Sequence, residues 1–514
     1  MIKFSPKTLK LVQALLLGAI FPLGFAPEHW VPLSAFALAG WFYLLYQASS
    51  RTQSFLLGLA FGVSWFFIGL QWTVNTMVEH GQLPWWLAQL GCFALALVLA
   101  LSPALSAWLL GPGQRRSALR FFLALAGLFT VTEWLRGEVI AQFDWLNPAY
   151  MTMGTPLAGW IPIVGEYGVL LVSLAVVALL TGALFPGRVG ARLIALTVGT
   201  TLLIGGMALE QPGWYDSRSP IPVEVIQPNL PVVDAFTRAD PADRMRAVLA
   251  LRESLGPHIP AAFSLIPEGI INEPFDRLSP RAQQGVEALA KQSAPIFLNG
   301  FRREGKHFFN TTVLFDARGA QYLLDKRRLV PFGEYVPEGA HWFVNLLGIP
   351  LSDLQPGSPI QPLAEIGQDK VGLLICYETL FGSVVRSLWH RGEGDQWVGP
   401  NVLATTANLG WFGQRINAQY LQINQLRAKE VARPMVVASN TGLSAVISAS
   451  GKVLDVFPMS ERHVELLAVP TAAGEPTLFV QLGYWPALLF AILLGIQGFF
   501  HQKRYDELSA PVIK

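Results

Sequence analysis

The stretch Val371-Gly372-Leu373-Leu374-Ile375-Cys376-Tyr377-Glu378-Thr379 decides how the second half of this chain folds. Its first five residues are aliphatic or small, and a run of this kind predicts a fully buried strand. Cys376 follows directly, in the position after a strand where α/β enzymes commonly carry a nucleophile. A free cysteine is more often a small buried hydrophobic residue, so both interpretations must be weighed against the rest of the chain.

The composition of the chain is that of a membrane protein. Of its 514 residues, 52% are hydrophobic and only 14% are charged, and the mean hydropathy is +0.40. Soluble domains carry about 25% charged residues, so the deficit is informative. The net charge of +2, without a basic tract, predicts no nucleic-acid partner.

Long apolar stretches predict eight transmembrane helices. Each stretch can cross a hydrocarbon core, which takes about 20 helical residues. The first could pass for a signal peptide, but a second apolar stretch follows at once and no small-residue cleavage site precedes it. The eight stretches lie near residues 10–25, 30–48, 54–75, 84–110, 118–136, 165–186, 190–208 and 485–500.

The character of the chain changes between about residues 215 and 475, where charges become frequent and apolar runs shrink to strand length. We therefore expect a transmembrane domain of seven helices over 1–214, a soluble domain over 215–475, and a last helix with a cytoplasmic tail over 476–514. Strand-like runs that alternate with helical ones predict an α/β layered domain. The expected strands are 222–226, 263–266, 295–300, 311–315, 371–375, 402–407, 435–438 and 444–448, and the expected helices are 241–255, 280–292 and 416–432.

The basic residues predict the orientation in the membrane. Lys and Arg gather in the N-terminal segment and in alternate loops, which are therefore expected on the cytoplasmic side. The opposite loops, Ala26–Trp30 and the one around Glu79, have no Lys or Arg, and Arg136 is the exception on the outer side. This pattern places the soluble domain on the outer face. The basic residues are Lys3, Lys7, Lys10, Arg51, Arg115, Arg116, Arg120, Arg188, Arg192, Lys503 and Arg504.

This orientation bears on the interpretation of Cys376. Exported domains usually pair their cysteines as disulfides. The chain has only two cysteines, and Cys92 lies inside a predicted span, where it is expected to pack against other helices. An unpaired thiol in an oxidising compartment is a liability unless the chemistry uses it. The nucleophile is therefore the favoured interpretation.

Two other segments contain possible partners for Cys376. Glu268 follows the strand-like run Phe263–Ile266, and Lys326 begins a charged cluster after another apolar run. Taken alone, Glu268 would be an exposed loop carboxylate and the cluster a solvated basic turn with an ordinary ion pair. Glu, Lys and Cys in this order, 58 residues (268 to 326) and 50 residues (326 to 376) apart, resemble the catalytic trio of the nitrilase superfamily.

Further motifs resemble those of bacterial apolipoprotein N-acyltransferases, and the resemblance covers essentially the whole chain. It implies an eight-helix membrane domain and an α/β nitrilase-like αββα sandwich. In the soluble domain it rests on Lys326–Pro337, Cys376–Glu378, Asn408–Gly413, Leu426–Glu430 and Ser439–Gly442. In the membrane part it rests on Phe25–Pro27, Thr132–Gly137, Trp145–Leu146 and Gly483–Pro486.

The resemblance implies that Cys376 is the nucleophile, Glu268 the general base and Lys326 the electrostatic stabiliser. The chemistry needs these residue types. A thiol with its ordinary pKa of about 8.5 is mostly protonated at neutral pH, so a base must take its proton. A cation can then stabilise the thiolate and the tetrahedral oxyanion.

Other residues are expected to support this trio. By the same resemblance, Glu334 would orient Lys326 or act as a second acid or base, and Tyr377 and Glu378 would form the wall beside the nucleophile. Weaker candidates for substrate contact are Phe236, Trp411 and Trp145. No metal cluster, P-loop or dinucleotide fingerprint is present, so no metal and no cofactor are expected.

The implied reaction is a two-step acyl transfer. Cys376 would take a fatty acyl group from a phospholipid, with phosphatidylethanolamine as the expected donor, and form a thioester. The N-terminal amine of a diacylglyceryl-cysteine lipoprotein would then accept the group. The expected partners are thus the phospholipid, the diacylated lipoprotein and membrane lipids, for a monomer in the bacterial inner membrane with its catalytic domain in the periplasm.

Four positions depart from the pattern of that family: Ile266 and Phe236 each replace a Trp, Leu409 stands in a motif that loses its Asp, and Tyr420 replaces a His. We expect these changes to lie on loops and arms that contact substrate. They leave open a divergent paralogue that acylates another amine. A membrane-tethered amidase that hydrolyses its thioester and a scaffold with a decayed nitrilase domain are further alternatives. Eight spans argue against the amidase, and the intact trio argues against the scaffold.

Overall fold

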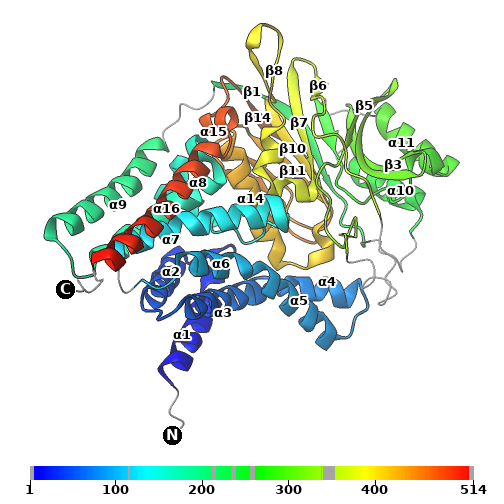
Figure 1. The fold of residues 1–514 in the computed structure, drawn as a ribbon. Coiled ribbons are helices and arrows are strands. Elements are labelled where there is room, and N and C mark those ends of the chain that lie inside the picture. The colour runs from blue at the N-terminus through cyan, green and yellow to red at the C-terminus, as the bar shows by residue number, and fades with distance from the viewer. Residues whose placement is uncertain are drawn as a thin grey trace, which may run out of the picture. The chain divides into compact units, whose positions relative to one another are not determined.

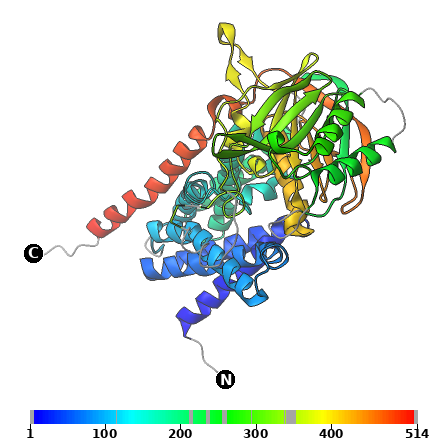
Figure 2. The same ribbon diagram turned by 90° about the vertical axis from the view of Figure 1, so that its right-hand side faces the viewer.

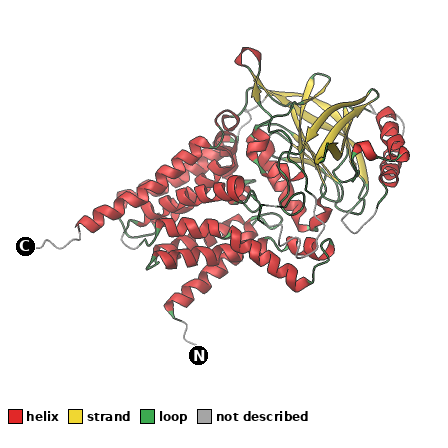
Figure 3. Cartoon of the chain, turned by 45° about the vertical axis from the view of Figure 1, so that its right-hand side comes forward, coloured by secondary structure: helices red, strands yellow, loops and turns green. Residues whose placement is uncertain are grey.

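The chain folds into two compact units, which are described separately. The computed structural model describes residues 5–113, 116–210, 216–232, 239–254, 261–292, 294–336, 338–339 and 353–508. The first, the helical unit, comprises residues 1–74, 83–211 and 481–514. The second, the sheet unit, comprises residues 75–82 and 212–480 and contains the described strands (Figure 1; Figure 3). Residues 75–82 thus group with the sheet unit, although the sequence predicts them within the transmembrane domain.

Six stretches of the described residues are long and apolar enough to cross a membrane. Two more apolar helices, Val31–Tyr46 and the segment Trp485–Gly498, are shorter. All eight lie where the sequence predicts spans, but by length and composition six of them, and not the predicted eight, are candidate membrane spans. The six stretches are Pro6–Gly24, Arg51–Gly69, Trp85–Leu110, Ala118–Ile140, Pro156–Ala183 and Val189–Leu209.

Local sequence explains where several of these helices begin. The Ser5 side chain accepts a hydrogen bond from the Thr8 backbone and Pro6 opens α1, while Ser50 caps α3 in the same way. The helices of the unit are α1 (Pro6–Ile20), α2 (Val31–Tyr46), α3 (Arg51–Gly69), α5 (Trp85–Leu99), α6 (Leu101–Leu110), α7 (Ala118–Trp134), α8 (Ile161–Ala183), α9 (Val189–Leu209) and α16 (Trp485–Leu508). Helix α4 (Trp72–Glu79) runs from this unit into residues 75–82.

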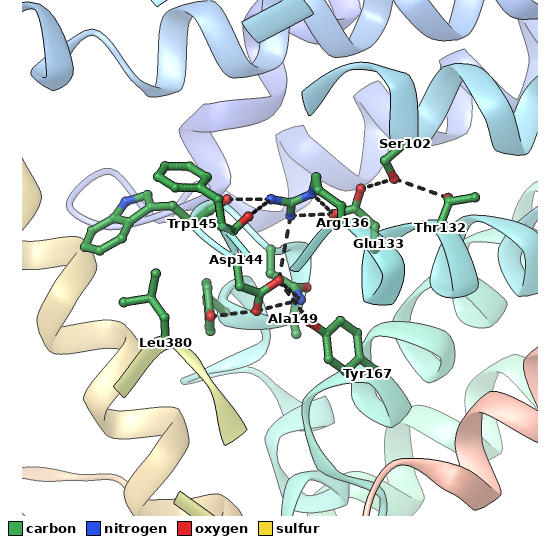
Figure 4. Close-up of polar contacts among 12 residues, drawn as sticks. Ser102, Thr132, Glu133, Arg136, Asp144, Trp145, Ala149, Tyr167 and Leu380 are labelled. Atoms are coloured by element: carbon green, nitrogen blue, oxygen red, sulfur yellow. Dashed lines mark hydrogen bonds and ion pairs between the residues drawn. The ribbon is translucent and has the colours of Figure 1, made fainter. Parts of the chain in front are cut away.

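Arg136, the basic residue predicted on the outer side, is buried and paired. It lies in the π-helical turn Leu135–Ile140 that follows α7. Its guanidinium donates to Oε2 of Glu133 from Nη2 at 2.6 Å and from Nε at 3.1 Å, and Nη1 donates to the carbonyl oxygens of Phe143 and Trp145 (Figure 4). Because its charge is neutralised inside the helical unit, Arg136 does not oppose the orientation that the loop charges predict.

Asp144 lies near Arg136 and belongs to the same cluster of buried polar side chains, which also includes Glu133. Its carboxylate accepts hydrogen bonds from the hydroxyl groups of Tyr167, at 3.1 Å, and Tyr150, at 3.0 Å, and from the amide of Asn147. Gly137 faces this carboxylate, and a side chain there would collide with Asp144 and Tyr167. The cluster is therefore a closely packed group of buried polar side chains within the helical unit.

Two six-stranded sheets form the sheet unit. Strands β7, β10 and β11 run parallel at the centre of the second sheet, where every residue of β10 is buried. The first sheet has the order β14 (His463–Ala473), β1 (Asp216–Gln227), β2 (Phe263–Leu265), β3 (Ile296–Glu304), β4 (His307–Asp316) and β5 (Gly319–Asp325). The second has the order β13 (Val453–Val456), β12 (Ala445–Ile447), β11 (Met435–Ser439), β10 (Val402–Ala407), β7 (Asp369–Ile375) and β6 (Ala364–Ile366). A small hairpin joins β8 (His390–Arg391) and β9 (Trp397–Val398).

Helices cover the outer face of each sheet, so the unit has four layers. Helices α10 (Pro241–Glu253) and α11 (Pro280–Gln292) lie against the first sheet (Figure 2). They pack Met245, Val248 and Leu289 into a core with β1 and β3. Helices α13 (Gly382–Arg386) and α14 (Arg415–Glu430) lie on the second sheet. The predicted αββα sandwich is confirmed.

Candidate active site

Cys376 lies at the sharp turn between β7 and the 3₁₀ helix η6 (Cys376–Leu380). Its φ is +47°, in the left-handed region that residues other than glycine seldom adopt. Strand β7 is parallel to β10 and carries the apolar run up to Ile375 into the core. The thiol is therefore held at the carboxyl end of a central strand, and Cys376 is 8% exposed.

Glu378 ties the turn at Cys376 to the segment that contains Lys326. Its Oε2 accepts from the backbone N–H of Ile375 at 2.8 Å, while Oε1 accepts from the backbone N–H of Arg327 at 2.7 Å and from its Nε at 3.0 Å. Glu378 is fully buried and Arg327 is nearly so. The alternative of a solvated basic turn does not hold for Arg327, because its charge is buried and paired with Glu378.

Lys326 lies between two carboxylates at the end of β5. Its Nζ is 2.9 Å from Oε1 of Glu334 and 3.5 Å from Oε1 of Glu268. The second oxygen of Glu334 accepts from the backbone N–H of Val330 at 2.8 Å, so both oxygens of this carboxylate are fixed. The ammonium is 1% exposed, and its charge is therefore felt with little screening by water.

Asn310, on β4, joins the same two carboxylates. Its Nδ2 donates to Oε1 of Glu268 at 2.8 Å and to Oε1 of Glu334 at 2.7 Å. Its Oδ1 accepts from Asn299 at 2.8 Å, which turns the NH₂ group toward the carboxylates. Asn310 is not among the residues predicted from the sequence, because its role depends on contacts with carboxylates that are distant along the chain.

Glu268 reaches this cluster from the loop after β2. The next residue, Gly269, has a φ of +84°, and a Cβ atom there would lie 2.5 Å from the Asn408 side-chain amide. Glycine is therefore required for both conformation and space. The backbone N–H of Asn408 hydrogen-bonds Cys376, so Asn408 contacts both the loop that carries the carboxylate and the turn that carries the thiol.

The electrostatics of the site favour a neutral thiol and a charged lysine. Burial raises the pKa of the Cys376 thiol well above its ordinary value, and Glu268 raises it further, whereas Lys326 acts in the opposite direction. Burial alone would lower the pKa of Lys326, but Glu268 and Glu334 outweigh it and raise that pKa. A neutral thiol in this position can give up its proton to a nearby carboxylate, and the ammonium of Lys326 can stabilise the resulting thiolate. Within the described ranges, no three His, Cys, Asp or Glu side chains are grouped so as to hold a metal ion.

The remaining predicted residues occupy different places. Tyr377 is 7% exposed and packs its ring edge-on against Phe381, with 5.2 Å between the ring centroids. Trp411 lies in η8 (Leu409–Phe412) of the sheet unit and is partly buried. Trp145 belongs to the helical unit, where it is buried against Trp72. Phe236 lies outside the described residues.

Three of the positions that depart from the family pattern are buried. Ile266 is fully buried among the apolar residues under α10 and α11, and Leu409 and Tyr420 are each 2% exposed. The expectation that these changes lie on substrate-facing loops is wrong for these three, since their side chains pack in the interior. Tyr420 lies on α14, and its hydroxyl donates to the carbonyl oxygen of Cys376.

Comparison with known proteins agrees with this architecture. Residues 17–179 match the model of the apolipoprotein N-acyltransferase N-terminal domain, and residues 267–470 match that of the carbon-nitrogen hydrolases. The fold and the site thus define a carbon-nitrogen hydrolase domain attached to a bundle of membrane helices.

Full-length relatives narrow the class. The apolipoprotein N-acyltransferase of Ralstonia nicotianae is 32% identical over 503 residues, which cover 96% of this chain and 93% of the relative. That of Bordetella bronchiseptica is 33% identical over 520 residues, with 93% and 94% covered. That of Methylococcus capsulatus is 30% identical over 509 residues, with 97% of each covered. The chain belongs to the apolipoprotein N-acyltransferase family, and it is a membrane-bound acyltransferase.

Proposed function

We propose that this protein transfers a fatty acyl group from a phospholipid to the N-terminal amine of diacylglyceryl-cysteine lipoproteins, through a thioester on Cys376. The observation that carries the proposal is the position of Lys326 between Glu268 and Glu334, beside a buried thiol that these charges act on. The family relationship supports lipoproteins as acceptors.

The first half-reaction acylates the enzyme. Glu268 takes the proton of the Cys376 thiol, and the sulfur attacks the carbonyl carbon of a phospholipid ester. Lys326 stabilises the oxyanion of the tetrahedral intermediate. When the intermediate collapses, the carbon–oxygen bond to glycerol breaks, the leaving alkoxide takes the proton from Glu268, and a lysophospholipid departs.

The second half-reaction transfers the group. The α-amine of the lipoprotein attacks the thioester carbonyl, and Glu268 takes a proton from the nitrogen. The carbon–sulfur bond then breaks as the amide forms, and the proton on Glu268 returns to the sulfur. Cys376 is restored as a thiol, and no external oxidant, reductant or cofactor is needed for balance.

The helical unit suits a reaction between two substrates that are both anchored in a membrane. A phospholipid and a diacylated lipoprotein are anchored in a membrane, so a catalyst carried by membrane helices meets both at high local concentration. In this proposal residues 215–475 form the catalytic domain. Residues 1–214 supply seven transmembrane helices, and residues 476–514 supply the eighth. The protein acts as a monomer in the bacterial inner membrane, with the catalytic domain in the periplasm and phosphatidylethanolamine as donor.

Incubation with acyl-labelled phosphatidylethanolamine tests the nucleophile. The protein should acquire a label that hydroxylamine removes, as expected of a thioester, and release an equal amount of lysophospholipid. Cys376→Ala should acquire none, while Cys92→Ala, which removes the other thiol of the chain, should be labelled as the native protein is. A labelled Cys376→Ala protein would show that the nucleophile is assigned wrongly.

Addition of a diacylated lipopeptide to the labelled protein tests the acceptor. The label should move to the lipopeptide amine and remain on it as an amide that hydroxylamine does not cleave. Release of free fatty acid without transfer would instead identify a hydrolase of the amidase type. If no label forms under any condition, the scaffold alternative gains support.

A further inference from the structure

The carbonyl oxygen of Cys376 accepts two hydrogen bonds from buried side chains. The Tyr420 hydroxyl donates to it at 3.1 Å, and the Thr379 hydroxyl donates at 3.2 Å. Tyr420 is 2% exposed and Thr379 is fully buried. Buried hydroxyl groups need partners, and here both use the same backbone oxygen at the proposed nucleophile.

This carbonyl belongs to a strained residue. Cys376 has a φ of +47°, a conformation that persists only where the surrounding structure holds it. Because the peptide between Cys376 and Tyr377 is planar, fixing its oxygen also fixes the ψ angle of Cys376 and the direction of the Tyr377 N–H. The two hydroxyl groups therefore determine how the backbone at the thiol is turned.

Helix α14 holds the other end of the same 3₁₀ turn. Arg427 lies seven residues after Tyr420, two helical turns along the same face. Its Nε donates to the carbonyl oxygen of Thr379 at 2.8 Å, and its Nη2 donates to that of Leu380 at 2.8 Å. One helix thus binds η6 at its first residue and at its last two.

The Tyr420 hydroxyl is kept as a donor. Burial raises the pKa of Tyr420 above its ordinary value, and Cys376 adds to this rise, so the phenol stays protonated. The Tyr420 hydroxyl also hydrogen-bonds the side chains of Thr379 and Asn424, and that of Thr405, on β10, at 3.3 Å. Since Tyr420 has a single hydroxyl hydrogen and Cys376 offers only an acceptor, Thr405 is the donor of the pair.

We propose that Tyr420 is a positioning residue for acyl transfer: its hydroxyl holds the Cys376–Tyr377 peptide in the orientation from which the sulfur attacks. This inference rests on the proposed function, because it takes Cys376 as the nucleophile. Loss of the hydroxyl should lower kcat for acyl-enzyme formation about tenfold, as expected for one buried hydrogen bond. The KM for phospholipid should stay unchanged, because Tyr420 lies beneath the turn.

Isotope-edited infrared spectroscopy reports this hydrogen bond without reference to activity. In a Cys92→Ala background, [1-¹³C]cysteine labels one carbonyl of the chain, that of Cys376. Tyr420→Phe keeps the ring and removes the donor, so the ¹³C amide I band should move to higher frequency. Thr405→Val is the matched control, because it removes a different partner of Tyr420 and leaves the donor to Cys376 in place.

The band and the rate must change together. The inference holds if Tyr420→Phe shifts the band and lowers kcat at constant KM, while Thr405→Val does neither. A band shift with a native rate, a rate loss without a band shift, or equal effects of the two variants would overturn it. Should Tyr420→Phe fail to fold, Thr379→Val must shift the same band and lower the same kcat.

The failure of the proposed function has a different signature. If Cys376→Ala still acquires the acyl label, there is no thiol nucleophile to position and both proposals fall. If Cys376→Ala is unlabelled and Tyr420→Phe transfers acyl groups at the native rate, the proposed function stands and the positioning role of Tyr420 does not.

Discussion

The Nζ atom of Lys326 and the Oε1 atom of Glu334 lie 2.9 Å apart, closer than the 3.5 Å between the same ammonium and Glu268. The other oxygen of Glu334 accepts from the backbone N–H of Val330, so this carboxylate joins the ammonium to the backbone. Glu334 is therefore suited to hold Lys326 in place. In the proposed mechanism Glu268 is then the carboxylate that takes the proton of the thiol.

Glu268→Gln should affect the reactivity of the thiol and acyl transfer in opposite directions. The Glu268 charge raises the pKa of Cys376, so its removal lowers that pKa and should speed alkylation by iodoacetamide at a fixed pH. Without a base, acyl-enzyme formation should fall about 10²–10⁴-fold. Both rates are measured in a Cys92→Ala background, and a parallel fall of the two would contradict the assignment of Glu268 as base.

The pH dependence of alkylation tests the cation. Burial raises the pKa of Cys376, so alkylation of the native protein should rise at a higher pH than for an ordinary thiol, whose pKa is about 8.5. Lys326 lowers the pKa of this thiol, so Lys326→Met should shift the curve to still higher pH. The same variant should lose about 10²–10³-fold in acyl transfer. A shift to lower pH would show that Lys326 does not act on the thiol.

Asn310→Asp should disable the site while retaining the size of the side chain. The change removes the amide that donates to Glu268 and Glu334 and places a third carboxylate beside them. Repulsion among the three carboxylates should misplace Glu268, with a fall in acyl transfer of about 10²-fold or more. Asn299→Asp, one contact further away, is the control and should fall less.

The buried pair in the helical unit should be more sensitive to the loss of one member than of both. Arg136→Met leaves the carboxylate of Glu133 buried without its cation, and loss of one partner of a buried pair costs about 3–5 kcal/mol. The double variant Glu133→Gln/Arg136→Met leaves no uncompensated charge in this pair. Thermal unfolding in detergent should therefore give a lower Tm for the single variant than for the double one; the reverse order would contradict the pairing.

The sequence predicted the buried parts of the fold better than the edges. Strands β7, β10 and β11 are apolar runs and were predicted at the correct places, as were α10, α11 and α14. Strands β5, β6, β13 and β14, the edge strands of the two six-stranded sheets, were not predicted, nor was the small β8–β9 hairpin. Edge strands have many exposed or partly buried side chains, so most of these sequences lack the long apolar run by which buried strands are recognised.

The sequence predicts only those residues of the candidate site that directly follow a recognisable strand. Cys376 and Glu268 were found because each follows an apolar run, and the resemblance to a known family supplied the rest of the trio. Asn310 and Arg327 act across the fold, on carboxylates that are distant in sequence, so no local pattern marks them. Tyr420 is a similar case, because its position beneath Cys376 depends on how α14 lies on the second sheet.

The sheet unit consists of two separate segments, 75–82 and 212–480, so a continuous fragment that starts near residue 212 lacks the first of them. The hydroxyl of Thr76 donates to the carbonyl oxygen of Trp411 at 2.8 Å, and the His80 ring packs against the Trp411 ring at 4.9 Å. A fragment that begins after α9 would lose these contacts, and Trp411 would lose its hydrogen bond with Thr76 and its ring contact with His80. Engineering a soluble form of the enzyme therefore calls for transplanting this short helical segment onto the fragment, for example as an appended peptide.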